Sequence, residues 1–207
     1  MKIILLGPPG SGKGTQAAML KNRLGVPAIS TGSMLRSEIA AGTDIGIKAD
    51  GYISRGELVP DGIILDIVES RFNKPDCIKG FILDGFPRTV AQAKALKNRT
   101  EIDAVVVLDL DDEFIIKRMG GRRICKKCDA AFHIKKNPPK TEGECDLCGG
   151  ALYTRVDDAP ETVKSRLDTY HKNTEPLLDF YEEKLLKVES YGGIDEVFGS
   201  VLAALGV

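Results

Sequence analysis

Near the start of the chain stands the stretch Ile3-Ile4-Leu5-Leu6-Gly7-Pro8-Pro9-Gly10-Ser11-Gly12-Lys13-Gly14-Thr15, an apolar run followed at once by a glycine-rich loop. The apolar run predicts a buried strand, and the loop predicts a turn into a helix. Glycines at positions 7, 10 and 12 let several backbone N–H groups converge on one anion. Lys13 adds a point charge, and the following helix adds the positive end of its dipole. We therefore expect a phosphate-binding loop with a polyphosphate as its ligand.

The loop departs from the strict Walker pattern at one position. Gly7, Gly12 and Lys13 match it, but Gly14 stands where a hydroxyl residue is expected and Thr15 comes one place later. One alternative is a glycine-rich turn with a surface lysine. A dinucleotide-binding fingerprint fits less well, because Thr15 replaces its third glycine and no acidic residue stands where a ribose partner is expected.

The composition favours one core with insertions. The chain has 207 residues, of which 43% are hydrophobic, and a net charge of −1 from 29 basic and 30 acidic residues. Such a balance gives no global field that would attract nucleic acid or an anionic membrane. No apolar run reaches the roughly 18 residues of a membrane span, and Met1-Lys2 leads directly into a strand rather than a signal peptide. A cytoplasmic protein is therefore expected.

Apolar runs alternate with helical patterns along the chain. Further strands are predicted at residues 26–29, 81–84 and 104–109, and helices at residues 15–24 and 90–97. This alternation predicts βαβ units and a parallel sheet.

The stretch 120–158 breaks this alternation, because it is rich in Lys, Cys, Gly and Pro and nearly free of Leu, Ile and Val. We interpret it as an insertion with its own cross-link. From Pro160 a helical period returns, with residues that fall on one face at three- and four-residue steps: Val163, Leu167, Tyr170, Leu177 and Leu178. The tail, with Val197, Val201 and Leu202, predicts a packed helix.

Four cysteines form two Cys-x-x-Cys pairs with sixteen residues between them: Cys125, Cys128, Cys145 and Cys148. This spacing is typical of two knuckles that hold one tetrahedral zinc ion. Four protein ligands leave no open coordination position, so the zinc is expected to be structural. The alternatives are unrelated thiols, two disulfides, or a zinc ribbon that binds nucleic acid. The last is disfavoured because acidic residues dilute the nearby lysines and Phe132 is nearly alone as a stacking aromatic.

Asp84 ends a hydrophobic strand, at the sheet edge where ligands of open α/β folds bind. Its carboxylate could hold Mg²⁺ directly or through water, although a helix cap is an equal alternative. Arginines lie on both borders of the insertion, at positions 118, 122, 123, 155 and 166. Such charges commonly form a solvated face. Because the two borders of one excursion return to the same place, these arginines could instead converge on one anion.

Several longer motifs resemble those of the adenylate kinase family, in its long bacterial form with a zinc-binding lid. They are residues 7–15, 30–36 (Ser-Thr-Gly-Ser-Met-Leu-Arg), 56–61 (Gly-Glu-Leu-Val-Pro-Asp), 83–89 (Leu-Asp-Gly-Phe-Pro-Arg-Thr) with Gln92, 121–123 (Gly-Arg-Arg) and 155–158 (Arg-Val-Asp-Asp). The resemblance covers essentially the whole chain.

The resemblance implies an α/β, P-loop three-layer fold with a central parallel sheet and two insertions. The core would comprise residues 1–29, 60–120 and 159–207. A small helical AMP-binding domain would comprise residues 30–59, and a lid with the zinc knuckle residues 121–158.

The resemblance also implies roles for individual residues. Phosphoryl transfer would rest on Lys13, Arg36, Arg88, Arg122, Arg155 and Arg166. ATP would bind at Gly10, Ser11, Gly12, Lys13, Gly14, Thr15, Arg118, Arg122, Ala131, Phe132 and Gly192. AMP would bind at Thr31, Arg36, Glu57, Leu58, Val59, Gly85, Phe86, Pro87, Arg88, Gln92, Arg155 and Arg166. Asp157 and Asp158 would help hold the lid shut, Asp84 would hold Mg²⁺ through water, and the four cysteines would hold structural Zn²⁺.

Two positions depart from the family pattern. Ser33 stands where the family usually has Asp, and we expect its hydroxyl to cap the following helix. Phe132 stands where Tyr is common, which removes a hydroxyl and keeps the ring.

The implied reaction is the Mg²⁺-dependent conversion of ATP and AMP into two ADP by in-line transfer with lid closure. The expected partners are therefore ATP, AMP and ADP, with no nucleic acid and no membrane, and the resemblance implies a monomer. One alternative is a related kinase for another nucleoside monophosphate. Another is a zinc-ribbon ATPase that binds nucleic acid, which would bind oligonucleotides in a salt-sensitive way.

Overall fold

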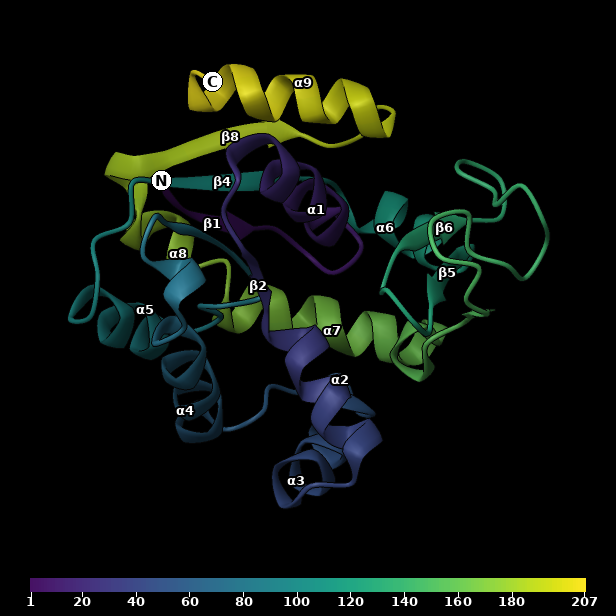
Figure 1. Cartoon of the computed structure of the whole chain (residues 1–207), viewed down its shortest axis with the longest axis horizontal. Helices are drawn as coiled ribbons and strands as arrows, with labels where there is room; N and C mark the ends of the chain where they lie inside the picture. The colour runs from purple at the N-terminus through teal and green to yellow at the C-terminus, as the bar shows by residue number, and fades with distance from the viewer.

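The fold centres on a five-stranded parallel sheet, seen in a computed structural model that describes residues 1–207 (Figure 1). The strand order is β2-β3-β1-β4-β8. The strands are β1 (Lys2–Leu6), β2 (Ala28–Ser30), β3 (Phe81–Asp84), β4 (Ala104–Asp109) and β8 (Leu185–Glu189). All four pairings are parallel, so the carboxyl ends of the strands lie at one edge.

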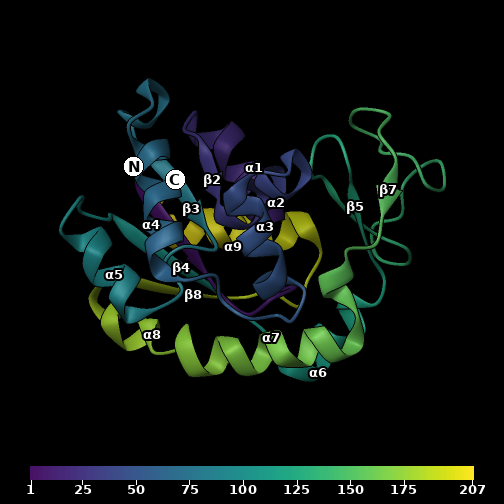
Figure 2. The same cartoon turned by 90° about the horizontal axis from the view of Figure 1, so that it is seen from below.

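Nine α-helices connect and cover the strands (Figures 1 and 2). They are α1 (Lys13–Leu24), α2 (Thr31–Ala41), α3 (Asp44–Ile53), α4 (Asp61–Phe72), α5 (Val90–Lys97), α6 (Asp112–Met119), α7 (Pro160–Asn173), α8 (Leu177–Phe180) and α9 (Ile194–Leu205). Short 3₁₀ turns occur at Pro75–Cys77, Val156–Asp158 and Glu182–Lys184. None of the helices combines the length and apolar character needed to cross a membrane.

The alternation of side chains along β1 builds two separate cores. Ile3 and Leu5 point to one face, where they pack with residues of α1 and α9 such as Leu20 and Val201. Ile4 and Leu6 point to the other face, in a cluster that reaches α4, α5 and α8. Because successive side chains of a strand point to opposite faces, this pattern gives three layers with the sheet in the middle. The expected α/β three-layer fold with a central parallel sheet is confirmed.

Two excursions leave the main sheet (Figures 1 and 2). Helices α2 and α3 form the first and pack against each other. The second is a three-stranded antiparallel sheet in the order β6-β5-β7, built from β5 (Arg122–Cys125), β6 (Ala131–His133) and β7 (Leu152–Tyr153). Its small core consists of Cys125, Cys145 and Phe132, so cysteines take the place that aliphatic residues occupy elsewhere.

Three expectations differ from the structure. The strand expected at residues 26–29 lies at Ala28–Ser30, and β8 was not expected at all. The residues from Val163 to Leu178 do not share one helical face, because α7 ends at Asn173, just before Pro176. Val163 and Leu167 pack with α6, whereas Leu177 lies in the core beneath the sheet.

Ser33 does not cap α2, which was the third expectation. The helix begins at Thr31, directly after β2, and the cap is Ser30, whose hydroxyl accepts a hydrogen bond from the backbone N–H of Ser33 at 3.4 Å. Ser30 still has the extended backbone of the strand, as a capping residue requires. Ser33 therefore lies within the first turn, and its hydroxyl accepts from Arg36 at 3.1 Å.

His171 joins α7 to α6 and makes the stability of this contact pH-dependent. Its Nδ1 lies 2.9 Å from the Glu175 carboxylate, and its Nε2 lies 3.0 Å from the Asp112 carboxylate. The hydrogen bond with Glu175, followed by that with Asp112, raises the pKa of His171 above its usual value, although partial burial opposes this. Because the pKa is raised in the folded state, the stabilisation is complete below the unfolded-state pKa of about 6.5 and is lost as the pH rises through the folded-state value.

We therefore expect His171→Gln to lower the melting temperature more at pH 6 than at pH 8.5. The side chain is 43% exposed, so solvent limits the effect to about 1 kcal/mol. Thermal melts of both proteins across this pH range measure it. Lys172→Gln, which removes a neighbouring cation that makes no ion pair, is the matched control. If His171→Gln lowers the melting temperature equally at both pH values, His171 does not supply the pH-dependent contact.

Candidate active site

The carboxyl ends of three neighbouring strands bring the first candidate residues together. Asp84, the last residue of β3, lies beside Leu5 of β1 and Ser30 of β2 in the sheet register. A carboxylate oxygen of Asp84 faces the first turn of α1, 3.5 Å from where a Cβ on Gly14 would lie. Thr89, not Asp84, caps the helix that follows β3, so the helix-cap alternative for Asp84 is excluded. A carboxylate oxygen at the mouth of a phosphate loop suits a hard cation such as Mg²⁺.

The loop between β1 and α1 leaves the start of the helix open to an anion. Helix α1 begins at Lys13 after Gly12, has no side-chain cap and has no acidic residue in its first turn. Gly10 has a φ of 81°, and a Cβ there would lie 2.6 Å from the sulfur of Met119, so only glycine fits. The helix dipole and the first backbone N–H groups are therefore free for a phosphate.

Lys13 is buried within this loop. Its ammonium donates to the carbonyl oxygens of Gly7 and Pro8, both at 2.7 Å. Burial, with a smaller contribution from nearby arginines, lowers the pKa of Lys13 to about 7, although Asp84 opposes the shift. A bound polyphosphate would favour the charged lysine, because an adjacent anion offsets the loss of water.

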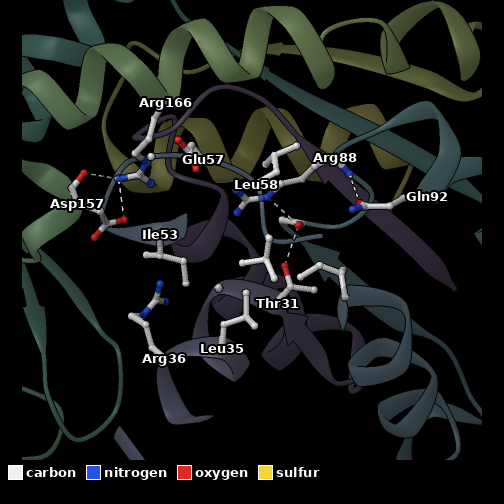
Figure 3. Close-up of a pocket in the computed structure, with 15 residues that line it drawn as sticks. Thr31, Leu35, Arg36, Ile53, Glu57, Leu58, Arg88, Gln92, Asp157 and Arg166 are labelled. Carbon is white, nitrogen blue, oxygen red and sulfur yellow. Dashed lines mark hydrogen bonds and ion pairs between the residues drawn. The ribbon is translucent and has the colours of Figure 1, made fainter. Parts of the chain in front are cut away.

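A second pocket lies next to the loop, between α2 and the segment after β3 (Figure 3). Its apolar wall includes Leu35, Ile53 and Ile64, and its polar groups include Thr31 and Arg88. Thr31 and Arg88 both donate to the carbonyl oxygen of Gly85, at 2.7 and 2.9 Å. Gly85 has a φ of 77°, and a Cβ there would lie 3.0 Å from Arg88 and 3.1 Å from Thr31, so a side chain would crowd both.

Gln92 is fixed in this pocket by hydrogen bonds at both ends of its amide. Its oxygen accepts from the backbone N–H of Arg88 at 2.7 Å, and its nitrogen donates to Asp61 at 2.6 Å. Asp61 also accepts from Thr89 at 3.1 Å. Gln92 is therefore held in one orientation by Asp61, which was not among the predicted site residues.

Arginines from distant parts of the chain converge between the loop and the pocket. Arg122 of β5 forms a two-pronged ion pair with Asp158, and Arg166 of α7 contacts Asp157 at 2.9 Å and Asp158 at 3.2 Å. Burial lowers the pKa of Arg88, Arg122 and Arg166. Guanidinium groups stay protonated in proteins, so these shifts express the cost of removing the charges from water, to which repulsion between arginines adds at Arg122 and Arg166. The arginines outnumber the two carboxylates that pair with them, and an anionic ligand would balance the remaining positive charge.

A cleft of about 1330 Å³ joins most of the predicted residues. It is larger than the roughly 300–1,000 Å³ of common ligand pockets. The predicted residues that line it are Gly10, Gly12, Lys13, Gly14, Thr15, Arg36, Leu58, Asp84, Gly85, Pro87, Arg88, Arg118, Arg122, Ala131, Phe132, Arg155, Arg166 and Gly192. Those that line the adjoining pocket are Thr31, Glu57, Val59, Gln92 and Asp157.

Two of the residues predicted to bind a nucleotide do not present their side chains to the cleft. Phe86 is 1% exposed and packs in the core beneath the sheet, and the Ser11 side chain is fully buried. Only their backbone groups remain for a ligand. The Ser11 carbonyl accepts from Ser190 at 2.7 Å, a contact between residues 179 positions apart that no sequence motif indicates.

The four cysteines meet in the small sheet, with all four sulfur atoms within 4.8 Å of one another. Three of the Sγ···Sγ distances are 3.4, 3.4 and 3.6 Å. A tetrahedral zinc ion with Zn–S distances of about 2.3 Å requires sulfur separations of about 3.8 Å. The cluster therefore fits zinc, and the two-disulfide alternative is disfavoured because all four thiols are free.

Known proteins match the chain over its whole length. A family model described as adenylate kinase matches residues 5–186. A protein of Caldicellulosiruptor bescii named adenylate kinase is 51% identical over 214 residues, covering all of both chains. Proteins of the same name from Clostridium beijerinckii and Syntrophobacter fumaroxidans are 49% and 48% identical over 213 residues, covering all of this chain and at least 99% of theirs. This chain therefore belongs to the adenylate kinase family.

Proposed function

We propose that the cleft transfers the terminal phosphoryl group of ATP to AMP, giving two ADP, and that the predicted site residues carry the reaction. The observation that supports this most is that the cleft beside the phosphate loop adjoins a second pocket, with arginines between them. A hydrolase would need only the first of these sites. A transferase between two nucleotides needs both, with the cations at their junction.

On the ATP side, the loop from Gly10 to Thr15 cradles the phosphates. Lys13 turns from the carbonyl oxygens it now contacts toward the terminal phosphates. Arg118 and Arg122 approach from the other side, while Ala131, Phe132 and Gly192 line the part of the cleft left for the base and ribose.

On the AMP side, Thr31, Gln92 and the backbone from Glu57 to Val59 surround the nucleoside. Apolar side chains form part of the pocket wall and would contact the base. Arg36 and Arg88 bind the phosphate of AMP, and the segment Gly85-Phe86-Pro87 lets the ligand approach the backbone. Asp61 and Arg88 fix the orientation of the Gln92 amide. The amide therefore selects a base whose hydrogen-bonding groups are complementary to it.

The reaction needs no general base, since the attacking phosphate oxygen of AMP is already an anion at neutral pH. Lys13, Arg36, Arg88, Arg122, Arg155 and Arg166 align the two polyanions and neutralise charge on the migrating group. The cations are in place before substrate arrives, so little reorganisation is needed during transfer.

Magnesium and zinc take different parts. Mg²⁺ bound with ATP supplies a Lewis acid for the phosphate oxygens, and the carboxylate of Asp84 would hold it through water. The zinc ion in the cysteine cluster has four protein ligands and stabilises the small sheet, where hydrophobic residues are scarce.

The chain divides into a core at residues 1–29, 60–120 and 159–207, an AMP-binding domain at 30–59 and a lid at 121–158. The two helices α2 and α3 fall within the second of these, and the separate antiparallel sheet within the third. Closure of both over the cleft would exclude water, which otherwise competes with AMP as the acceptor. Asp157 and Asp158 support closure by anchoring Arg122 and Arg166.

We further infer a cytoplasmic monomer that binds neither nucleic acid nor membranes. The net charge of −1 supports the absence of a polyanionic partner. The zinc-ribbon ATPase is the rival, and it predicts ATP hydrolysis without an acceptor together with salt-sensitive binding of oligonucleotides.

The acceptor specificity is tested with purified protein, MgATP and one of AMP, GMP, CMP or UMP. We expect nucleoside diphosphate with AMP alone, because Gln92 and its fixed partners select the base. Chromatography of the products measures this. Rapid reaction with another monophosphate would assign the protein to a sister activity, and phosphate release without any acceptor would support the ATPase.

Arg88→Ala and Arg122→Ala are each expected to reduce kcat by about 10²–10³, equivalent to roughly 3–4 kcal/mol of barrier, by analogy with the loss of one oxyanion-stabilising donor. Initial rates of ADP formation measure it. Arg99→Ala is the control, since Arg99 is 64% exposed and pairs with Glu69 away from the cleft. Turnover at the wild-type rate in either of the first two variants would refute the corresponding role.

Removal of zinc by a chelator is expected to lower the melting temperature by about 5 °C or more, which corresponds to about 2 kcal/mol for a chain of this size. Activity at moderate temperature should fall less, because the ion does not touch substrate. Calorimetry and rate assays before and after zinc is restored measure both. Cys77→Ser, which changes the one cysteine outside the cluster, should retain the metal and its effect. An apoprotein as stable as the metal-bound form would count against a structural ion.

A further inference from the structure

Asp129 has an unusual backbone in the first zinc knuckle. It follows Cys128 directly, and its N–H donates to the carbonyl oxygen of Cys125 at 3.1 Å. It is the one residue other than glycine with a positive φ, at 58°. A side chain is retained at a turn that glycine would satisfy with less strain. This raises the question of what the carboxylate contacts.

The carboxylate of Asp129 lies between two arginines from different parts of the fold. One oxygen is 3.8 Å from Arg36 of α2, and the other is 3.5 Å from Arg155, which follows β7. Asp129 thus links the helical excursion to the small sheet. Both arginine side chains are mostly buried, with 24% and 12% of their surface exposed.

The two arginines otherwise have few partners. Arg36 donates to the neutral hydroxyl of Ser33, and the Nε atoms of both arginines are buried without a hydrogen-bond partner. Burial lowers the pKa of Arg36, the proximity of Arg155 lowers it further, and Asp129 is the first of the groups that oppose this. Without Asp129, two like charges would face each other across the cleft with less to balance them.

We propose that Asp129 is a positioning residue of the kinase, whose carboxylate holds the lid toward the AMP-binding helices by attracting Arg36, while its second oxygen attracts Arg155 within the lid. The inference rests on the proposed function for the role of those arginines. The attraction between α2 and the small antiparallel sheet does not depend on the proposed function.

The long distances decide how this contact affects substrate. At 3.5–3.8 Å the carboxylate is beyond the range of strong hydrogen bonds, so the donor groups of both arginines stay available to phosphate. The Coulomb attraction falls off slowly and persists at this separation. Asp129 therefore favours closure more than it competes with AMP, and its loss should weaken AMP binding.

Two substitutions separate the charge from the backbone. Asp129→Asn removes the charge with a residue that tolerates positive φ, and Asp129→Gly removes it while relieving the backbone. Glu142→Gln is the matched control, because Glu142 is an exposed acid of the same insertion and makes no ion pair.

Small-angle X-ray scattering of the ligand-free proteins and steady-state kinetics with AMP as the varied substrate test the proposal. We expect both Asp129 variants to have a larger radius of gyration than the wild type, and the difference to shrink as salt screens the wild-type contact. KM for AMP should rise about three- to tenfold, while kcat changes by less than about twofold. Asp129→Gly should melt at or above the wild-type temperature, which shows that the kinetic effect does not come from unfolding.

Wild-type dimensions and a wild-type KM for AMP in both Asp129 variants would overturn the proposal. Equal effects in Glu142→Gln would also overturn it, since they would show a general charge effect. The scattering measurement contains no substrate, so it remains decisive for the contact even if the wild-type protein fails to use AMP, which would instead refute the proposed function.

Discussion

The burial of β1 on both faces is the constraint on which the rest of the structure depends. Its odd-numbered residues pack under α1 and α9, and its even-numbered residues pack against the helices of the opposite layer. Because β1 is the central strand, this packing fixes where the phosphate loop leaves the sheet. Parallel pairing then brings Ser30 and Asp84 to the same edge. The position of the site thus follows from the core, before any functional side chain is considered.

The cations at this edge oppose folding, and the fold tolerates them for functional reasons. Burial lowers the pKa values of Lys13, Arg88 and Arg166, and repulsion from neighbouring arginines adds to this effect at Lys13 and Arg166. Asp157 and Asp158 balance part of the charge. The remainder is left for two polyanionic substrates, which makes the free protein less stable than it would be with a neutral cleft. A site arranged in this way binds phosphates strongly because its charges are already assembled.

Local patterns in the sequence predicted much of this arrangement. The clearest signals are the apolar runs at β3 and β4 and the helical period at α5. Each is bounded by turn residues and is buried on a face that its periodicity predicts. β8 was missed because Lys187 and Glu189 interrupt its apolar residues and it follows a 3₁₀ turn, with no βαβ spacing to mark it. The cap of α2 was misplaced by three residues because a strand joins that helix without a loop. Asp61 and Asp129 could not be predicted, because their roles depend on contacts between segments that are distant in sequence.

The bond from Ser190 to the phosphate loop has a consequence for how the protein is made. The phosphate loop ends at Thr15, but the Ser190 hydroxyl that donates to the Ser11 carbonyl lies near the end of the chain. Gln16 of α1 similarly donates to the carbonyl of Ile194, and β8 pairs with β4 only after the small antiparallel sheet has been synthesised. Since domains generally fold as units during translation, a nascent chain on the ribosome carries the nucleotide-binding sequence long before it can support the binding geometry. The contacts that brace the phosphate loop therefore form only after the last strand and helix of the chain have been synthesised.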